Sequence, residues 1–534
     1  MLRMPFKLKS LTMGNLDIRI FGLALLPALL SCCGWKGGWL TTVGPDYTTP
    51  PLQTAAHWNF SHDSSAMPIA HSGNPSELKR SDMLIAHSGD PSELKRWWER
   101  FNDPVLAKLL AAAQQVNASI AIAKANIVQA RASFIEANAS VLPNLDVNAG
   151  ATRGGFDIQN IDIGNKSYGF PNIDYTMYKG GAQSNWEIDL FGGLARQQEA
   201  SQSQLDSKNA KWHDARVAVA VEVANAYVAY RHCEVRVKLA LADAKSRDES
   251  ARLSAIMGQA GFSAPADVAL AHATADDGNR TLLEQRAQCE RSVKGLVEMT
   301  GLAEREVRQL LTGTPERVAR LPSPPVFRMD AVPARALLQR PDVAAAERDM
   351  AQACANVGVE RAKQFPKLTL TGNISRMMAN IDISAVSSIG LGLQTWSIGP
   401  TLSLPLFDAG KRAANTKAAQ AQYEASVVSF RAKVRIAVKE VEDALVRLLS
   451  IEQRLPYARA AEDDYQKSFT AQQALYRAGL GSLIDAESVR RNAIAAQINV
   501  AELELEQVNA LIALYRAAGG NWEDGKAAPK SVPE

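Results

Sequence analysis

The segment 186-WEIDLFGGLAR-196 decides the fold because its hydrophobic period changes partway along. Apolar residues at 186, 188 and 190 alternate with acidic residues at 187 and 189, which is typical of a strand with one apolar and one polar face. After the glycines at 192 and 193, no proline occurs before Pro265, and the run is rich in Ala, Gln, Lys, Glu and Val. The sequence therefore predicts a two-faced strand that leads into a helix, which would reach roughly 100 Å if it is continuous up to Gly258.

The bulk composition is that of a folded protein without a strong electrostatic field. Of the 534 residues, 46% are hydrophobic and 22% are charged, and the net charge of +3 gives no strong attraction for nucleic acid or an anionic membrane surface. The five cysteines form no CxxC pair and have no His-rich spacing beside them, so the sequence indicates neither a disulfide framework nor a zinc site. No GxxxxGK[ST], HExxH or GxSxG motif occurs, and we predict no enzyme, no cofactor and no metal site.

The N-terminus has the features of an export signal. Basic residues precede the apolar run 20-IFGLALLPALL-30, which is too short to span a bilayer of about 30 Å but suits a signal peptide. The following 29-LLSC-32 resembles the lipobox of bacterial lipoproteins, which predicts removal of residues 1–31 and lipid attachment at Cys32. Cys33 stands where an aspartate would signal retention at the inner membrane, so the outer membrane is favoured. The alternative is an ordinary signal peptide with an incidental cysteine.

Internal similarity divides the rest of the chain into two copies of one plan. The segment 117–145 aligns with 340–368, and the later landmarks correspond in the same order. Each copy reads helix, strand, loop, strand, long helix, turn, helix. We therefore expect a linker at 32–96, a first repeat at 97–320, a second repeat at 321–522 and a disordered tail at 523–534.

Four segments alternate with a period of two, near 144–149, 186–190, 367–374 and 398–406. Prolines at 400 and 405 indicate a sheet edge or a bend in the fourth. Long loops at 154–181 and 378–394 are expected to join the strands within each repeat. Four strands cannot close a barrel, and one alternative is a sheet that lies on a soluble core with its polar face in water.

The expected helices argue against a soluble core. A second long helical run extends from Gly410 to Ala478, where Pro456 should kink or interrupt it, and shorter helices after Pro265 and Ser482 should return alongside. A single globular core cannot cover such lengths. No segment after the signal peptide offers 18 uninterrupted apolar residues, so no transmembrane helix is expected and any membrane span would have to be a barrel. Three copies would supply 12 strands, apolar toward lipid and polar toward a water-filled lumen.

The order of several short motifs supports a family resemblance. These landmarks are 43-VGPDY-47, 97-WWERFNDPVLAKLL-110, 340-RPDVAAAE-347, 365-FPKLTL-370, 401-TLSLPLFDAGKR-412, 476-YRAGLGSLIDAE-487 and 514-LYRAAGGNW-522. Together they resemble the TolC-type bacterial outer-membrane efflux proteins, in particular the lipoprotein (OprM/NodT-like) branch that serves RND multidrug efflux systems. The resemblance covers nearly the whole chain from Cys32 to Trp522.

The resemblance implies an α+β membrane protein and a passive role. Three chains would form a homotrimer, with a 12-stranded β-barrel in the lipid of the outer membrane and a tube of α-helical hairpins in the periplasm. The implied partners are a periplasmic adaptor (membrane fusion) protein and an inner-membrane RND-type transporter, which supplies the energy. The implied function is the exit duct of a multidrug efflux pump.

The resemblance also implies a periplasmic entrance at the two helix turns, 260-AGFSAPADV-268 and 478-AGLGSLIDA-486. It places an acidic constriction at Asp485 and, by the internal repeat, at Asp267, where three inward-facing carboxylates would repel one another and attract cations. The alternative is that each aspartate caps the helix that follows the turn.

Further positions in and near these turns follow from the same resemblance. Gly261 and Gly479 are the implied adaptor-docking turns, and Tyr476 and Arg477 stand where the family places a latch. Gly481 and Ser488 occupy positions that are acidic in some or many relatives, so this gate should be less acidic.

The sequence leaves other functions and the role of one unusual feature open. The same duct could serve type I protein secretion or metal export, and a different class would be a lipid-anchored coiled-coil scaffold without a pore. The segment 69–80 recurs almost unchanged as 85–96, which we interpret as a lengthened surface linker.

Overall fold

The computed structural model describes residues 37–49, 84–87, 97–156, 161–163, 166–168, 173–313, 319–322, 326–329, 337, 340–384 and 387–520. The chain divides into two compact units, which are described separately. The sheet unit comprises Met1–Asp46, Glu136–Glu199 and Ala355–Ala419. The helical unit comprises Tyr47–Ile135, Ala200–Cys354 and Gln420–Glu534.

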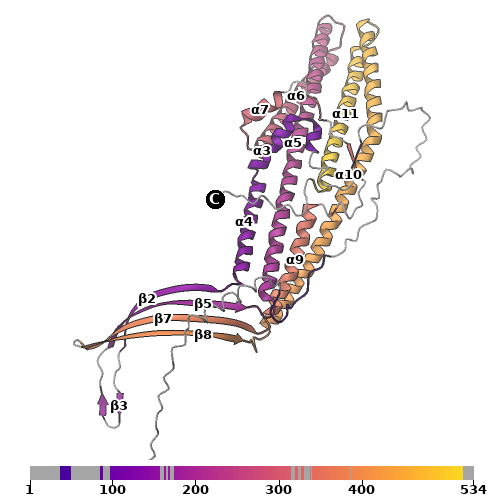
Figure 1. Cartoon of the computed structure of the whole chain (residues 1–534). Coiled ribbons are helices and arrows are strands. Elements are labelled where there is room, and N and C mark those ends of the chain that lie inside the picture. The colour runs from indigo at the N-terminus through magenta and orange to yellow at the C-terminus, as the bar shows by residue number, and fades with distance from the viewer. Residues whose placement is uncertain are drawn as a thin grey trace, which may run out of the picture. The chain divides into compact units, whose positions relative to one another are not determined.

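The sheet unit is built on one four-stranded antiparallel sheet (Figure 1). Its strands are β2 (Asn144–Phe156), β5 (Ile173–Ile188), β7 (Lys367–Ser384) and β8 (Ser387–Ser403), in the order β2-β5-β7-β8. Each sequence repeat contributes one pair, and β5 and β7 join the two pairs. A short hairpin, β3 (Ile161–Ile163) and β4 (Lys166–Tyr168), lies between β2 and β5 in the sequence.

The strands are longer than the sequence pattern predicts. The expected loops at 154–181 and 378–394 are mostly strand, because β2 ends at Phe156, β5 begins at Ile173 and β7 and β8 are separated only by residues 385–386. The fourth strand, in contrast, ends at Ser403, so the expectation that it continues to 406 is wrong. Pro400 lies within β8, which is an edge strand of the sheet in the single chain, a position where a proline is tolerated.

The segment that decides the fold forms the junction between β5 and a long helix. Backbone amides of 39–43 donate to the carbonyls of 189–191, so an N-terminal segment pairs with the chain just after the strand ends. Gly192 has a φ of 77°, and a Cβ there would lie 2.6 Å from the Thr42 side chain, so both backbone conformation and space require glycine. The Asp189 carboxylate then accepts a hydrogen bond from the Ala195 amide at 2.9 Å, in the first turn of the helix.

A buried arginine strengthens this junction. Arg196 is 5% exposed, and its guanidinium lies 2.5 Å from the Asp46 carboxylate and 2.7 Å from that of Glu199. The motif 43-VGPDY-47 therefore contributes an ion-pair partner as well as backbone hydrogen bonds. These contacts fix the point at which the strand becomes a helix.

Long helical hairpins make up most of the helical unit (Figure 1). The long helices are α5 (Gly193–Gln259) and α10 (Lys411–Arg477), each of 67 residues, whose first turns belong to the sheet unit. The returning helices are α6 (Pro265–Thr300) and α11 (Leu483–Ala517), as the sequence predicts. The expected interruption at Pro456 is absent, since α10 continues through this residue. Buried neighbours on both sides of it, Leu455 and Ala458, pack with α11, which stabilises the helix where one hydrogen bond is lost.

Shorter elements surround these hairpins. They are η1 (Trp98–Phe101), α3 (Pro104–Val116), α4 (Ala118–Ala139), α7 (Glu304–Thr312), α9 (Pro341–Ala362) and a parallel pair of strands, β1 (Leu84–His87) and β6 (Val326–Met329). Part of the duplicated segment 85–96 thus lies in a strand. Within the described chain, no single helix is long and apolar enough to cross a membrane; α3 and α4, bent by 42°, pass that test only together.

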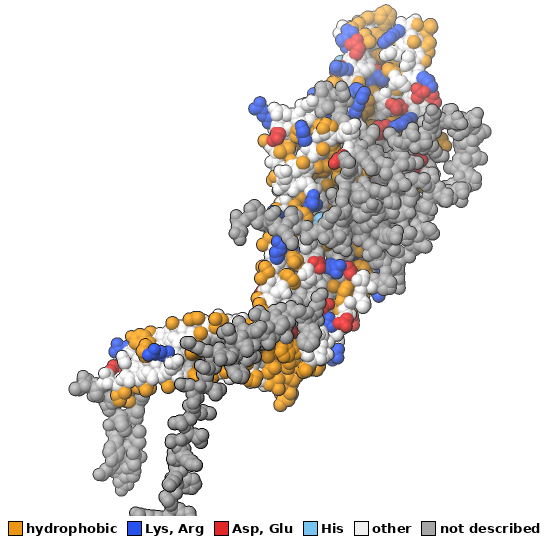
Figure 2. Space-filling model, viewed as in Figure 1, with side chains coloured by type: hydrophobic (Ala, Val, Ile, Leu, Met, Phe, Trp, Pro, Cys, Tyr) orange, Lys and Arg blue, Asp and Glu red, His pale blue; other side chains and the backbone are white. Residues whose placement is uncertain are grey.

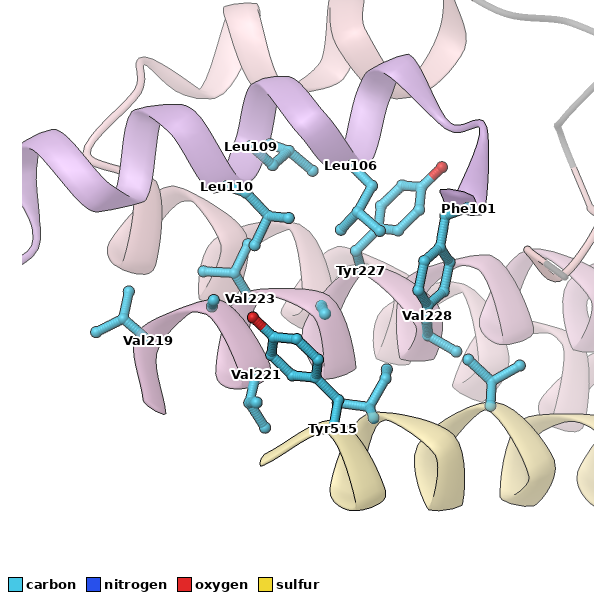
Figure 3. Packing of buried hydrophobic residues seen from close by; sticks show 14 of the residues in the cluster. Phe101, Leu106, Leu109, Leu110, Val219, Val221, Val223, Tyr227, Val228 and Tyr515 are labelled. Atoms are coloured by element: carbon cyan, nitrogen blue, oxygen red, sulfur yellow. The ribbon is translucent and has the colours of Figure 1, made fainter. Parts of the chain in front are cut away.

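The core of the helical unit lies where η1 and α3 meet α5 and α11 (Figure 3). Trp97 is fully buried and stacks on Tyr515 with ring centroids 4.6 Å apart. Asp103 caps α3 and also accepts a hydrogen bond of 2.8 Å from the Tyr227 hydroxyl. This core holds the middle of the long hairpins together and leaves their turns to project beyond it.

A disulfide joins the two helices of the first hairpin. Cys233 on α5 and Cys289 on α6 are bonded, with their Cα atoms 5.5 Å apart. The sequence led us to expect no disulfide framework, and for this pair of cysteines that expectation is wrong. It is consistent with an exported chain, because disulfides persist in oxidising compartments such as the periplasm.

Candidate functional site: the turns of the two helical hairpins

The two hairpin turns have the same backbone structure. In the first, the Gly261 amide donates to Gly258 O at 3.1 Å and the Phe262 amide donates to Met257 O at 2.8 Å. This pair of bonds is the Schellman motif that commonly ends a helix with glycine. Gly261 has a φ of 79°, in the left-handed region.

The second turn repeats this geometry at equivalent positions. The Gly479 amide donates to Tyr476 O at 3.0 Å and the Leu480 amide donates to Leu475 O at 2.9 Å, with a φ of 74° at Gly479. A Cβ would meet nothing within 4 Å at Gly479 or Gly261, so the backbone conformation alone selects glycine. The turns that the resemblance singled out are therefore a matched pair of structures.

Each turn presents a large apolar side chain that sequence reasoning missed. Phe262 is 80% exposed and Leu480 is 78% exposed, each directly after the turn glycine. A residue at this position usually packs back on its own helix, which neither of these does. An apolar residue that directly follows a helix-ending glycine was the available signal.

The two aspartates do not cap the helices, so that alternative is wrong. The capping residues are Ala264, whose side chain makes no cap bond, and Ser482, whose hydroxyl accepts from the Asp485 amide at 3.1 Å. Asp267 and Asp485 are both exposed in the first turn of their helices, where a negative charge is favourable. Among the described residues, neither carboxylate has a hydrogen-bond or ion-pair partner, so both are available to other groups.

The remaining predicted residues lie at the end of α10 and the start of α11. Tyr476 is half-buried, and its carbonyl oxygen closes the second turn, whereas Arg477 is exposed in the last helical turn. Gly481 packs near the Tyr476 amide, and Ser488 is exposed on α11. The predicted lipid site, Cys32, lies outside the described residues.

A buried charge cluster near the turns was not predicted from the sequence. Arg490 on α11 is 4% exposed, and it pairs with Asp243 on α5 at 2.5 Å and with Glu487 at 2.6 Å. The Ser250 hydroxyl on α5 donates to Glu487 at 2.7 Å. Arg247 also pairs with Asp243 at 2.9 Å, so two arginines contact this carboxylate.

This cluster connects three of the four hairpin helices. Besides its contact with Asp243, Arg247 donates to Thr274 O of α6 at 3.2 Å. Its aliphatic stem crosses Gly278 of α6, where a Cβ would lie 2.8 Å from Arg247 Cδ. The second hairpin is therefore fastened to α5, and the same cluster joins α5 to α6, close to the candidate entrance.

Paired hairpins with matched turns and a two-faced four-stranded sheet define the class of TolC-type channels of the bacterial outer membrane. The chain belongs to the outer membrane efflux protein family, whose model matches residues 109–302 and 332–520. These two segments fall in the two sequence repeats.

Individual relatives agree with this assignment. The solvent efflux pump outer membrane protein SrpC of Pseudomonas putida is 27% identical over 479 residues, covering 90% of this chain and 95% of the relative. Nodulation protein T of Rhizobium leguminosarum bv. trifolii is 28% identical over 436 residues, covering 80% and 88%. The solved structure of the outer-membrane channel OprN matches with a TM-score of 0.71 and 26% identity, covering 90% of this chain and 99% of that chain.

These similarities confirm three predictions made from the sequence. They are the family, the fold class and the location in the outer membrane. The protein is thus an efflux component of the outer membrane and not an enzyme.

Proposed function

We propose that this chain forms the exit duct of a tripartite efflux pump. Three copies assemble and passively conduct drugs or other small molecules to the outside from a periplasmic adaptor and an inner-membrane RND-type transporter. One observation carries the proposal, namely the two-faced sheet with open edges. It is supported by the efflux pumps named among the relatives, which include solvent and toluene pumps.

The half of the sheet nearest the helices has one apolar face. We call it the Ile398 face, because it carries Ile398 and the residues that the strand register places on the same side of the sheet. Its exposed apolar members also include Leu145, Val147, Ile374, Trp396 and Leu402. Val147 is 81% exposed and Trp396 is 75% exposed. In water such a surface would cost about 25 cal/mol per Å² of apolar area, whereas lipid accepts it.

The opposite face of the same half is polar. We call it the Ser397 face, and its members in register include Asn144, Asp146, Asn148, Gln183, Thr371 and Asn373. These groups suit a water-filled lumen. A sheet with one lipid-compatible and one water-compatible face is what a membrane barrel requires.

Assembly in threes removes the open edges of the sheet. The strands β2 and β8 lie at its two edges, so each leaves one row of backbone groups unpaired by the other three strands. Pairing β2 of one copy with β8 of the next satisfies these groups and closes a barrel of 12 strands. Lipid attachment at Cys32 adds a second anchor in the same membrane.

The hairpin turns form the periplasmic entrance. Asp267 and Asp485 supply exposed carboxylates for an acidic constriction, with Tyr476 and Arg477 as a latch at the second turn. The exposed side chains of Phe262 and Leu480, presented by the turn glycines, supply apolar contacts for the adaptor. This arrangement couples docking to the segment that narrows the tube.

Adjacent residues of β8 provide a matched test of this function. Ile398→Asp places a charge in the lipid and should abolish insertion and efflux, whereas Ser397→Asp places it in the lumen and should leave both largely intact. The measurement is accumulation of a fluorescent dye, with heat-modifiable trimers scored on gels, in cells whose own outer-membrane channels are deleted. Equal tolerance of both substitutions would contradict the proposed duct.

A further inference from the structure

The polarity of the Ser397 face changes along the strands. In the half far from the helices it carries Tyr175 and Met177 of β5, Ala379 and Ile381 of β7, and Ile389 and Leu391 of β8. These six residues, which we call the apolar patch, form two successive rows in register: Met177, Ala379 and Leu391, then Tyr175, Ile381 and Ile389. Hydrophobic side chains are visible along the sheet in Figure 2.

The Ile398 face changes from apolar to polar in the same half of the sheet. At the level of the apolar patch it carries Thr176 and Asp174 of β5 and Asn380 and Asp382 of β7. Arg153 of β2 lies 3.9 Å from Asp174 on this face. The only register irregularity in β7 and β8 lies between Asp382 and Ser384, beyond the patch. Each face therefore stays on its own side of the sheet along the strands. The polarity of the two faces is exchanged because the residue types change along the sequence, and not because the register shifts.

The strand lengths explain why the faces invert. A tilted strand of about 9–11 residues spans the lipid, whereas β5, β7 and β8 have 16, 18 and 17 residues. Starting from Leu368, the lipid therefore reaches about as far as Met378. Beyond that level the Ile398 face is in water, which accounts for its polar residues.

Contact with lipid cannot explain the apolar patch, because the patch lies on the Ser397 face and beyond the level of the lipid. At this height both sides of a wide, water-filled barrel would be wet, and exposed apolar rows on the inside would be unfavourable. In the single chain the β8 part of the patch is open, since Ile389 is 53% exposed and Leu391 is 49% exposed, whereas Ala379 is buried and the other three residues are half-buried. In the proposed barrel its counterparts on two further copies face it across the lumen.

We propose that three copies of the apolar patch form a hydrophobic constriction at the exit end of the duct. This inference rests on the proposed function, which puts the Ser397 face inside. A narrow apolar ring excludes hydrated ions by dewetting, whereas amphiphilic organic molecules can cross it in contact with the side chains. The duct thereby gains a second barrier, within the barrel, that selects against hydrophilic solutes.

Cysteine labelling on whole cells tests this constriction in the full-length protein. Ser397→Cys places a reporter in the lumen below the patch, and the probe is a sulfonated fluorescent maleimide too large for general porins, so that it enters from outside. Labelling should be slow in the otherwise native chain and several-fold faster when Ile381→Ser and Leu391→Ser are added. The matched control, Tyr178→Ser with Met378→Ser on the opposite face of the same sheet, should leave the rate slow.

The outcomes separate this inference from the proposed function. Rapid labelling of Ser397→Cys in the otherwise native chain would overturn the constriction. An unchanged labelling rate when Ile381→Ser and Leu391→Ser are added would overturn it as well. A second reporter, Ile398→Cys, tests the duct itself, because that position should stay unlabelled in lipid whichever result the patch gives. Equal labelling at 397 and 398 would show that both faces are wet and would remove the duct along with the constriction.

Discussion

The guanidinium of Arg490 on α11 lies 2.5 Å from the carboxylate of Asp243 on α5, and this buried pair fastens the second hairpin to the first close to the turns. Both side chains are largely shielded from water, so the pair is weakly screened. The contact links the two halves of the sequence repeat at the place where the entrance would open.

Arg490→Ala should strongly weaken the contact between the two hairpins. Removal of Arg490 leaves Glu487 without its buried arginine and leaves Asp243 with Arg247 as its remaining cation. Breaking a buried ion pair in this way typically costs about 3–5 kcal/mol. We expect a lower thermal unfolding midpoint and faster proteolysis at the turns. The matched control is Lys439→Ala at the exposed pair with Asp443, 2.7 Å apart, which should change the midpoint little. Equal effects of the two substitutions would contradict the role of Arg490.

Gly261→Ala and Gly479→Ala should each destabilise a turn by about 1–2 kcal/mol, because an L-residue with a Cβ disfavours the left-handed conformation. No neighbouring atom opposes the added methyl group at either site, so the effect isolates backbone strain. Gly295→Ala in the interior of α6, where a Cβ also meets nothing, should instead stabilise by about 0.5–1 kcal/mol. Chemical denaturation of the three variants measures the difference in sign.

Asp342 should make the helical unit sensitive to acid. Burial alone would raise the pKa of Asp342, but hydrogen bonds and charge from Arg340 outweigh it and lower the pKa below 3.8. A lowered pKa contributes stability that is present above about pH 4 and is lost as the pH falls through the folded-state value. Asp342→Asn should therefore lower the unfolding midpoint at neutral pH and flatten its acid dependence. An unchanged pH profile would contradict this assignment.

Asp214, which lines a polar cavity together with Arg340 and Asp342, should respond to pH in the opposite way. Burial, together with the nearby charge of Asp342, raises the pKa of Asp214 above 3.8. The folded state then favours the protonated form, so stability decreases as the pH rises from about 3.8 through the folded-state value. Asp214→Asn should raise the midpoint at neutral pH relative to the native chain. A lower midpoint at neutral pH would show that the attraction of the surrounding cations outweighs burial.

The disulfide between Cys233 and Cys289 should be a substantial source of stability. Its sequence separation of 56 corresponds to about 4 kcal/mol in the chain-entropy description. We expect the double Cys→Ser variant to unfold at a lower temperature than the native protein under oxidising conditions. Reductant should lower the unfolding midpoint of the native protein and leave that of the variant unchanged. If reductant lowered both midpoints equally, the disulfide would not be the source of this stability.

The sequence predicted the architecture well where one periodicity was uniform. The alternation around Trp186 identified a strand, and the proline-free run after Gly193 identified α5. The far halves of the strands were missed because the apolar residues change face: Met377, Ala379 and Ile381 lie on the side that carries Thr371 nearer the helices. A break in periodicity was interpreted as a loop, although β5, β7 and β8 continue through it.

Contacts between residues that are far apart in the sequence were also not predicted. The pairing of Arg490 with Asp243 depends on how two hairpins pack, which no local pattern contains. The disulfide had a usable signal, because Cys233 and Cys289 are equally far in sequence from Gly261 and therefore meet if the hairpin turns there. The turns themselves were found, whereas their exposed apolar residues became evident only from the structure.

Single-particle imaging of the full chain, extracted from outer membranes in mild detergent, tests most directly whether the protein is a trimeric duct. If the chain forms the proposed duct, the images should show a threefold hollow cylinder in which a short barrel continues into a helical tube on the order of 100 Å long. A monomer, or a solid helical rod without a barrel, would contradict it.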